Sequence, residues 1–461
     1  MDGNEIKVPK RILNTLLSSL AAGVVPRSGA PYIAIGRKEE IASLLGNLDE
    51  VDEGGAAVRF LIGRYGSGKS FLIQLIRGYA TDRGFLCADA DLSPERRLSG
   101  GSDAGLSTYR ELMKNLSSKA APDGGALPIL LSRYYATLQA ELLKENLTPE
   151  DPGFVSGIVS AVSGLLDELE GYVGGFDFAR VLAAYFRASA EDDGEVRSAC
   201  LRWLRGEFSG KSEARSALGF RVGSVIDDEN WYDYLKLWAI LSRKIGYKGL
   251  IVFIDECVNL YKIPNRISRE ANYEKLLAIF NDTLQGRAKS LCVIFGGTPQ
   301  FLEDTRRGLF SYEALRSRLQ DGRFSEAGYQ NLSAPVIRLR RLSDNELLAL
   351  IRRLTILFEE KEGVRDLISP ERMERFLTAS LARAGAEEMV TPREIIRDYL
   401  TLLSILRDHP DADFDKLLGE SGAPLPGDER EDAIGETLIG SPSDRNERGS
   451  KPAVSVFDLD L

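Results

Sequence analysis

One glycine-rich segment has the residue types and the spacing that bind phosphate. It reads Gly63-Arg64-Tyr65-Gly66-Ser67-Gly68-Lys69-Ser70 and fits the pattern G-x-x-x-x-G-K-[ST]. Glycines let backbone N–H groups curl round phosphate oxygens, Lys69 can bridge the β- and γ-phosphates, and the Ser70 hydroxyl can ligate Mg²⁺. A glycine-rich turn could fit the pattern by accident, but here a β-rich run, 58–62, precedes it and a helical run follows. The segment, with Phe71 beside it, therefore predicts a P-loop that binds ATP and Mg²⁺.

Two adjacent acids supply the other half of this chemistry. Asp255 and Glu256 end an unbroken apolar run, 250–254, of the kind that a strand buried on both faces shows. In nucleotide hydrolysis the first carboxylate would hold Mg²⁺ and the second would act as base on the attacking water. Because adjacent strand residues point to opposite faces, both acids reach one site only if the strand ends there. The alternative is an apolar strand that merely ends in surface acids.

The segments around these residues alternate between strand and helix. Strands are expected at 58–62, 85–90, 250–254 and 291–295, and helices at 38–45, 69–79, 231–245 and 273–284. Strands separated by helices form parallel sheets that are covered on both faces. The predicted fold class is therefore α/β, with a parallel-sheet P-loop core, a large helical insertion and a C-terminal helical lid.

Changes in composition divide the chain further. The predicted parts are an N-terminal helical arm (1–30), a nucleotide-binding core (31–110 and 221–341), a helical insertion (111–220), a helical lid (342–410) and a tail expected to be disordered (411–461). Insertion helices are expected at 129–144, 154–172, 178–190 and 195–208. Lid helices are expected to begin at a capping box, Ser343–Glu346, and at Ser369-Pro370 and Thr391-Pro392.

Composition argues against several other classes of protein. The net charge of −10 argues against a surface that binds nucleic acid throughout, although a local basic groove could coexist with it. Cys87, Cys200, Cys257 and Cys292 are too far apart for a zinc site and are expected to be buried free thiols. A single histidine, His409, leaves almost no material for histidine-based catalysis. Without a signal sequence or a long apolar run, a cytoplasmic protein with no membrane partner is expected.

The order of the motifs resembles the AAA+ superfamily, and within it the initiator-like branch. The segment Ile35-Gly36-Arg37 resembles the motif that packs near adenine in that family. The resemblance implies that Thr298 lies near the γ-phosphate as sensor 1, and that Arg393 contacts it as sensor 2. Alternatively, Thr298 only caps the next helix, and Arg393 only pairs with Glu394 or Asp398.

The same resemblance implies an arginine finger, a cation that one subunit inserts into the ATP site of its neighbour. The segment 313–319 resembles the one that carries the finger, with Arg318 as the first choice and Arg316 as the second. An arginine pair on a surface helix can also be simply solvated. A finger of this kind requires a homo-oligomer, which the resemblance therefore predicts.

More specifically, the chain resembles the P-loop ATPases that include BrxD of the bacterial BREX phage-defence systems. The resemblance covers roughly residues 5 to 405 and is carried by the P-loop and by 91–98, 253–256, 295–299 and 392–397. It implies a role in anti-phage defence, with a helicase-type protein partner and DNA. Two departures are the long separation of Ser70 from Asp255 and the lack of a winged-helix segment after the lid. Four arginines are candidate phosphate contacts or else surface charges: Arg96, Arg97, Arg202 and Arg205.

Together these features predict an ATPase that depends on Mg²⁺. The alternative is a regulatory switch or scaffold that binds ATP, turns over slowly and recruits an effector. A small-molecule kinase fits less well, because no compact acceptor-binding lid is visible in the sequence.

Overall fold

The fold is built around a five-stranded β-sheet. This computed structural model describes all residues except 1–7, 165–168, 170, 322–330, 383–390 and 421–461. All neighbouring strands are parallel, in the order β2-β3-β4-β1-β5. The strands are β1 (Ala56–Ile62), β2 (Leu86–Asp91), β3 (Leu250–Asp255), β4 (Leu291–Gly297) and β5 (Val336–Arg338). The predicted α/β fold with a parallel sheet is confirmed, and β5 is an added strand that was not foreseen.

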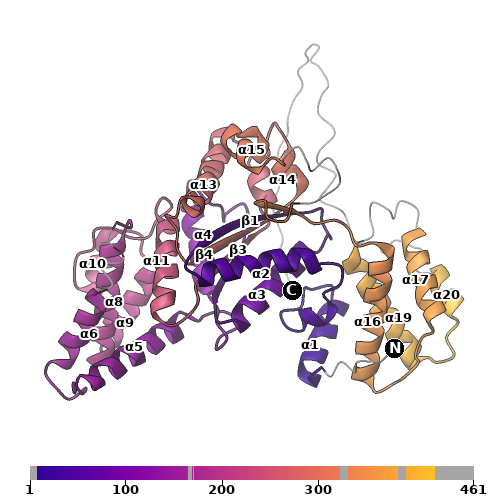
Figure 1. Cartoon of the computed structure of the whole chain (residues 1–461), viewed down its shortest axis with the longest axis horizontal. Coiled ribbons are helices and arrows are strands. Elements are labelled where there is room, and N and C mark those ends of the chain that lie inside the picture. Colours follow the sequence, from indigo (N-terminus) through magenta and orange to yellow (C-terminus); the bar gives the residue numbers. More distant parts are fainter. Residues whose placement is uncertain (1–7, 165–168, 170, 322–330, 383–390, 421–461) are drawn as a thin grey trace, which may run out of the picture. The chain divides into compact units, whose positions relative to one another are not determined.

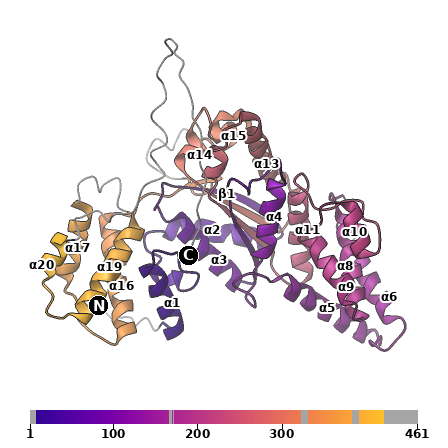
Figure 2. The same ribbon diagram turned by 180° about the vertical axis from the view of Figure 1, so that it is seen from behind.

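Helices cover both faces of this sheet because each strand alternates its side chains between two hydrophobic clusters. On β1, Val58 and Phe60 belong to one cluster, and Ala57 and Leu61 belong to the other. The first face is covered by α4 (Ala104–Lys114), α11 (Trp231–Lys244) and α13 (Arg266–Leu284). The second is covered by η1 (Ala30–Ile33), α2 (Lys38–Asp52) and α3 (Lys69–Asp82), as Figures 1 and 2 show from opposite sides.

Short helices follow the carboxyl ends of the two central strands. They are α12 (Val258–Tyr261), α14 (Pro299–Glu303), η2 (Leu309–Ser311) and α15 (Glu313–Leu319). Asn259 ties the first of them to the loop after β2, because its side-chain N–H donates to the carbonyl of Leu92 at 2.8 Å. These contacts fix the loops that leave the same edge of the sheet.

Between α4 and α11 the chain forms further helices, which share one continuous hydrophobic cluster with them and with the sheet. The described ones are α5 (Leu127–Lys144), α6 (Phe154–Ser163), α8 (Gly175–Ala190), α9 (Gly194–Leu204) and α10 (Lys211–Leu218). Phe178 on α8 packs edge-on against Trp238 on α11, with ring centroids 5.0 Å apart. The indole N–H of Trp238 donates to the Tyr109 hydroxyl on α4 at 3.0 Å. Of the predicted helix 154–172, α6 accounts for Phe154–Ser163, and residues 165–168 and 170 lie outside the described residues.

Three helices form the predicted lid, and their starts agree with the sequence signals. They are α16 (Asp344–Glu362), α17 (Pro370–Ala382) and α19 (Pro392–Asp408). Capping boxes begin α16 at Ser343 and α19 at Thr391. The N-terminal helix α1 (Lys10–Ala21) packs against α16 and α19. The domain boundaries drawn from the sequence stay predictions.

The last described element, α20 (Phe414–Glu420), belongs to a separate unit that begins at Asp413. It forms a helix at the start of the segment that was expected to be disordered. The rest of that segment, 421–461, lies outside the described residues. Among the described helices, none is both long and apolar enough to cross a membrane. Free, buried thiols are found at all four cysteines, as predicted.

The packing of Trp238 predicts a large loss of stability on truncation. Trp238→Ala removes the ring contact with Phe178 and leaves the buried Tyr109 hydroxyl without its indole donor. We expect a loss of about 3–5 kcal/mol, as for other large-to-small changes of buried aromatic residues. Urea unfolding followed by far-UV circular dichroism measures this loss in the free energy of unfolding. Ile267→Ala, at a 78% exposed position on α13, is the control and should change stability by less than about 0.5 kcal/mol. Equal effects of the two substitutions would contradict this packing.

Candidate nucleotide-binding site

The glycine-rich segment forms a loop between β1 and α3, in the context that the sequence predicted. Gly66 and Gly68 have φ angles of 74° and 90°, a region that other residues rarely adopt. Gly68 immediately precedes α3, so the loop ends at a helix N-terminus, where free N–H groups and the helix dipole favour an anion. Phe71, in the first turn of α3, packs against the hydrophobic cluster beneath the loop.

Lys69 folds back over the loop. Its ammonium donates to the carbonyls of Gly63 at 2.8 Å and Arg64 at 3.1 Å, and it lies 5.5 Å from the ring centroid of Tyr65. Tyr65 is 57% exposed at the tip of the loop. Burial lowers the pKa of Lys69, while the nearby carboxylates Asp255 and Glu256 act in the opposite direction. The cation is therefore held at the loop by weak neutral acceptors, for which phosphate oxygens are stronger substitutes.

The Ser70 hydroxyl joins the P-loop to the acidic end of β3. Its Oγ donates to Oδ2 of Asp255 at 2.7 Å. Asp255 is only 8% exposed, and its other oxygen, Oδ1, accepts the backbone N–H of Glu256 at 2.8 Å. A hydroxyl beside a carboxylate matches how Mg²⁺ binds in nucleotide sites, with one or two protein ligands and the substrate phosphates. Among the described residues, no group of three or more His, Cys, Asp or Glu forms a metal site by itself.

A glycine on the intervening strand makes this hydrogen bond feasible. β4 lies between β1 and β3, and a Cβ at Gly296 would lie 2.1 Å from Oδ1 of Asp255. The carboxylate of Asp255 thus occupies the space that a side chain at 296 would need. In the sequence, Gly296 stands out only as part of the segment 295–299. Its closeness to Asp255 depends on which strands are neighbours in the sheet.

The chain turns sharply at Glu256, which is why two adjacent acids reach one site. Glu256 has a φ of 57°, uncommon for a residue with a Cβ, and it directly follows β3. Both acids line the same pocket. This agrees with the expectation that they reach one site only if the strand ends between them. Burial raises the pKa of Glu256, and the negative charges of Asp255 and Asp91 raise it further. A carboxyl with a raised pKa is better suited to accept a proton from water.

This pocket, of about 390 Å³, also contains side chains that sequence analysis missed. Asp91 ends β2 in register with Asp255, and Asp89 pairs with Arg77 across 3.1 Å. Burial is the main cause that raises the pKa values of both Asp89 and Asp91. The missed acids belong to a weakly apolar strand, and only the strand order places them beside Asp255. The pocket is completed by Gly23, Val24, Val25, Arg27, Ser70, Ile73, Gln74, Phe253 and Arg393.

The lid contacts the P-loop at the start of α19. A Cβ at Gly66 would lie 2.3 Å from Cγ2 of Thr391, so the two residues are in close contact. Two positions further on, Arg393 lines the acidic pocket and is exposed. Within the part of the chain that the structure describes, Glu394 and Asp398 have other recorded partners. Glu394 instead completes the capping box with Thr391, and Asp398 pairs with Arg397. Arg393 thus remains the candidate for sensor 2.

Two other residues suggested by the AAA+ resemblance, Thr298 and Ile35, lie in different places relative to the P-loop and the acidic pocket. Thr298 is buried directly after β4, and its Oγ1 accepts the N–H of Phe301, so it does cap α14. The preceding carbonyl, of Gly297, accepts the N–H of Gly63 at 3.1 Å, which keeps Thr298 close to the P-loop. Ile35 lies between η1 and α2, outside the acidic pocket. The adenine and sensor 1 roles stay predictions.

The two finger candidates lie on α15. The Arg318 guanidinium donates to the carbonyl of Ala314 in the same helix at 2.7 Å, and Arg316 pairs with Glu313 at 4.0 Å. These contacts are local, so the structure of one chain leaves the finger assignment a prediction.

Three of the four arginines considered as phosphate contacts have carboxylate partners. Arg96 pairs with Glu111, Arg202 with Glu213 and Arg205 with Glu207. These pairs favour the alternative, that the arginines serve as surface charges. Arg97 lies in the same loop after β2 as Arg96. Its backbone N–H donates to the backbone carbonyl of Ala104.

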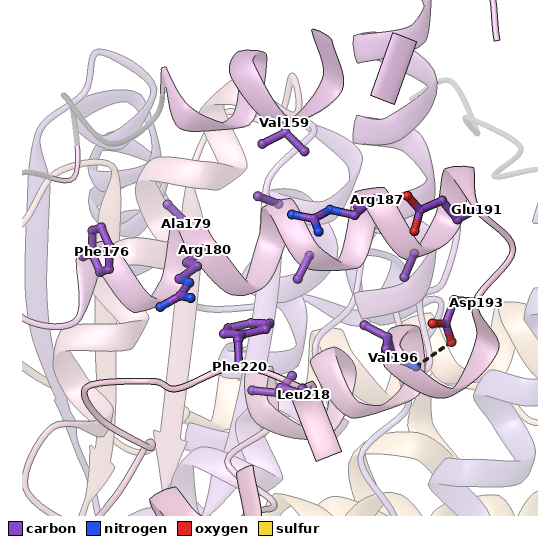
Figure 3. A pocket seen from close by; sticks show the side chains of 14 residues that line it. Val159, Phe176, Ala179, Arg180, Arg187, Glu191, Asp193, Val196, Leu218 and Phe220 are labelled. Atoms are coloured by element: carbon purple, nitrogen blue, oxygen red, sulfur yellow. Dashed lines mark hydrogen bonds between the residues drawn. The ribbon is translucent and has the colours of Figure 1, made fainter. Parts of the chain in front are cut away.

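A second pocket, of about 570 Å³, lies within the inserted helices and has a different character. Figure 3 shows Phe176, Arg180 and Phe220 around it, and the guanidinium of Arg180 lies 4.6 Å from the Phe220 ring centroid. Asp193 points toward its own helix, where it caps α9. The P-loop and the acids Asp255 and Glu256 do not belong to this pocket.

Comparison with known families agrees with this site. The family model described as "BREX system ATP-binding protein BrxC/D" matches residues 8–422, most of the chain. The chain belongs to the BrxC/D family. The predicted recognition of a BREX ATP-binding protein is therefore confirmed, and ATP is the nucleotide that the family description names. A search of curated proteins gives no match.

Gly296 provides a direct test of the metal side of this BrxC/D site. Gly296→Ala would push Asp255 away from Ser70, since the new Cβ and Oδ1 cannot both keep their places. We expect the affinity for Mg²⁺-ATP to fall by about 10–100-fold, the range typical when a metal ligand loses its support. Isothermal titration with and without Mg²⁺ measures this loss.

The matched control is Gly46→Ala in α2, where a Cβ would meet nothing within 4 Å. Its Mg²⁺-ATP affinity should equal that of the wild type. Unchanged Mg²⁺-ATP affinity in Gly296→Ala would show that Asp255 does not need its observed position.

Proposed function

We propose that this chain hydrolyses ATP to ADP and phosphate in the presence of Mg²⁺. The observation that carries the proposal is the hydrogen bond from Ser70 to Asp255, with the carboxyl of Glu256 in the same pocket. A binding site alone has no need of a second acid in that place. A buried base beside a metal-binding pair is what hydrolysis requires.

Each residue of the site has a role in this proposal. The loop N–H groups and Lys69 hold the phosphates, and Ser70 and Asp255 would hold Mg²⁺. Mg²⁺, when bound, neutralises charge on the phosphate oxygens. Glu256 takes a proton from water as the water oxygen bonds to the γ-phosphorus and the bond to the β–γ bridging oxygen breaks. Arg393 would contact the γ-phosphate from the lid.

The proposal extends to an assembly of several copies. Arg318, or failing that Arg316, would reach the ATP of a neighbouring subunit, and Thr298 would act near the γ-phosphate. The support is the resemblance to AAA+ proteins together with the position of α15 after β4. A homo-oligomer follows, because a finger works only between subunits.

We further propose that the activity serves anti-phage defence in the bacterial cytoplasm, on or near DNA, with a helicase-type protein partner. Membership of the BrxC/D family supports the defence role. Four buried free thiols are typical of a reducing compartment. DNA and the helicase-type partner rest on the resemblance.

A slow switch is the second candidate, and one observation favours it. The contact of Thr391 with Gly66 places the lid directly on the phosphate-binding loop. Any change in that loop on nucleotide binding must therefore act on α19. In this alternative the lid position, rather than turnover, would control recruitment of an effector.

Replacement of Glu256 separates the two functions. Glu256→Gln keeps the shape of the side chain but cannot accept the proton, so we expect kcat for ATP to fall by about 10²–10⁴-fold. The affinity for ATP should stay within about threefold of the wild type, because Lys69 and Ser70 are intact. Phosphate release at steady state, with and without DNA, and equilibrium binding of ATP measure the two quantities.

Glu270→Gln is the control for this experiment, since Glu270 forms an exposed ion pair with Arg266 on α13. Its turnover should match that of the wild type. Stimulation of the wild type by DNA, lost in Glu256→Gln, would support action on DNA. Equal and negligible turnover in the wild type and in Glu256→Gln, with ATP still bound, would refute hydrolysis and leave the switch.

A further inference from the structure

A buried arginine ahead of the P-loop joins that loop to the segment that leads into the lid. Arg37 immediately precedes α2, and it is only 4% exposed. Its Nη2 donates to the carbonyl oxygen of Ser67 at 2.8 Å and to that of Arg340 at 2.6 Å. Its Nη1 donates to Oε1 of Glu40 at 3.2 Å. One guanidinium therefore holds the P-loop and the connection from β5 to α16 together.

The carbonyl of Ser67 has a particular importance within the loop. In a trans peptide the C=O of one residue and the N–H of the next point in opposite directions. When Arg37 holds the Ser67 carbonyl on its own side, the N–H of Gly68 is turned to the other side. Gly68, with a φ of 90°, is the last residue before α3, where the loop binds anions. Arg37 thus fixes the direction of a phosphate-binding N–H group without touching phosphate.

The other end of this connection is equally constrained. Arg340 donates two hydrogen bonds of 2.6 Å to the carboxylate of Glu346, which also caps α16 together with Ser343. Gly36 has a φ of 73°, and a Cβ there would lie 2.6 Å from Oε1 of Glu346. A shift of the Arg340 carbonyl therefore cannot occur without a shift at the start of α16.

Burial of the guanidinium is costly unless all its partners are in place. Taking a charge out of water is unfavourable, and the ion pair with Glu40 offsets this only while the geometry is kept. The burial of Arg37 thus favours an all-or-none arrangement of its three contacts. Such an arrangement transmits displacement instead of absorbing it.

We propose that Arg37 is a positioning residue that couples nucleotide binding at the P-loop to the position of the lid helix α16. This inference rests on the proposed function, because a nucleotide must bind at the P-loop for the coupling to act. This positioning role is separate from contact with adenine, since the guanidinium of Arg37 donates hydrogen bonds to two backbone carbonyls and one carboxylate. By linkage, the lid position must in turn alter nucleotide affinity.

Arg37→Lys tests the coupling, because an ammonium keeps the charge but cannot replace both arms of the guanidinium. Arg59→Lys is the matched control. Arg59 lies on β1, donates to the carbonyl of Ser333 at 2.9 Å and to Asn47 at 2.7 Å, and has no contact with the P-loop. The measurements are ADP affinity by titration calorimetry, the thermal midpoint, and hydrogen exchange of the peptide 340–347 with and without ADP.

We expect Arg37→Lys to bind ADP at least about tenfold more weakly and to lose the ADP-dependent change in exchange at 340–347. Arg59→Lys should lower the thermal midpoint but keep both nucleotide responses. Arg37 has only a structural role if Arg37→Lys binds ADP within twofold of the wild type. The same conclusion follows if ADP still changes hydrogen exchange at 340–347 in this variant. If the wild type binds neither ADP nor ATP, the proposed function fails, and the coupling fails with it.

A second variant keeps the test decisive if Arg37→Lys does not fold. Glu40→Gln removes the charge that orients the guanidinium but leaves the Ser67 and Arg340 carbonyls as acceptors. We expect a smaller loss of ADP affinity, about threefold, with a weakened exchange response at 340–347. An ADP affinity and an exchange response equal to those of the wild type would overturn the coupling.

Discussion

The hydrogen bond between the Ser70 hydroxyl and Asp255 is the contact on which the rest of the site depends. It joins two residues that are 185 positions apart in the chain. The contact is feasible because β1, β4 and β3 are neighbours in a parallel sheet, so that their carboxyl ends meet at one edge. It also requires the missing side chain at Gly296, over which the carboxylate of Asp255 lies. Strand order and one glycine thus determine where the Ser70 hydroxyl and the Asp255 carboxylate meet.

The balance of charge in the pocket follows from the same arrangement. Asp255, Glu256, Asp89 and Asp91 gather where β2 and β3 end, and Lys69 is a cation close enough to interact electrostatically with the first two. Carboxylates brought together and buried raise one another's pKa values, as at Glu256 and Asp91. A divalent cation would relieve this repulsion, whereas a nucleotide alone would add to it. The acidity of the pocket therefore favours a nucleotide that arrives with Mg²⁺.

Much of the fold could be predicted because its signals are local. The P-loop, the buried strand before Asp255 and the capping boxes at Ser343 and Thr391 are each written within a few consecutive residues. β5 escaped because three residues are too few for a visible alternation. Asp91, Gly296 and the buried contacts of Arg37 escaped for another reason. Their roles depend on which distant segments become neighbours, and a single sequence gives no pattern for that.

The chemistry assigned to single residues divides in the same way. The positions of Lys69, Ser70, Asp255 and Glu256 in the fold could be predicted, since each motif fixes the place of its residues at the end of a strand or the start of a helix, while their chemical roles stay predictions. The choice between Arg318 and Arg316 as the proposed finger stays a prediction, because the contacts that would decide it lie between copies of the chain. Thr298 was left with two readings, and its hydrogen bond to Phe301 supports the capping role without removing it from the neighbourhood of the P-loop.

The continuous hydrophobic cluster beneath α5 to α10 restricts how this family can change over evolution. Trp238 on α11 packs on Phe178 of α8, and Tyr109 on α4 donates to the carbonyl of Leu204 of α9, so a deletion of 127–218 would expose apolar faces of α4 and α11. Lengthening or shortening is therefore tolerated only at the outer turns, such as the exposed one between α5 and α6. A substitution on the inserted helices must therefore fit the side chains of α4 and α11 that it meets in this cluster, and those helices in turn lie on the sheet that carries the nucleotide site.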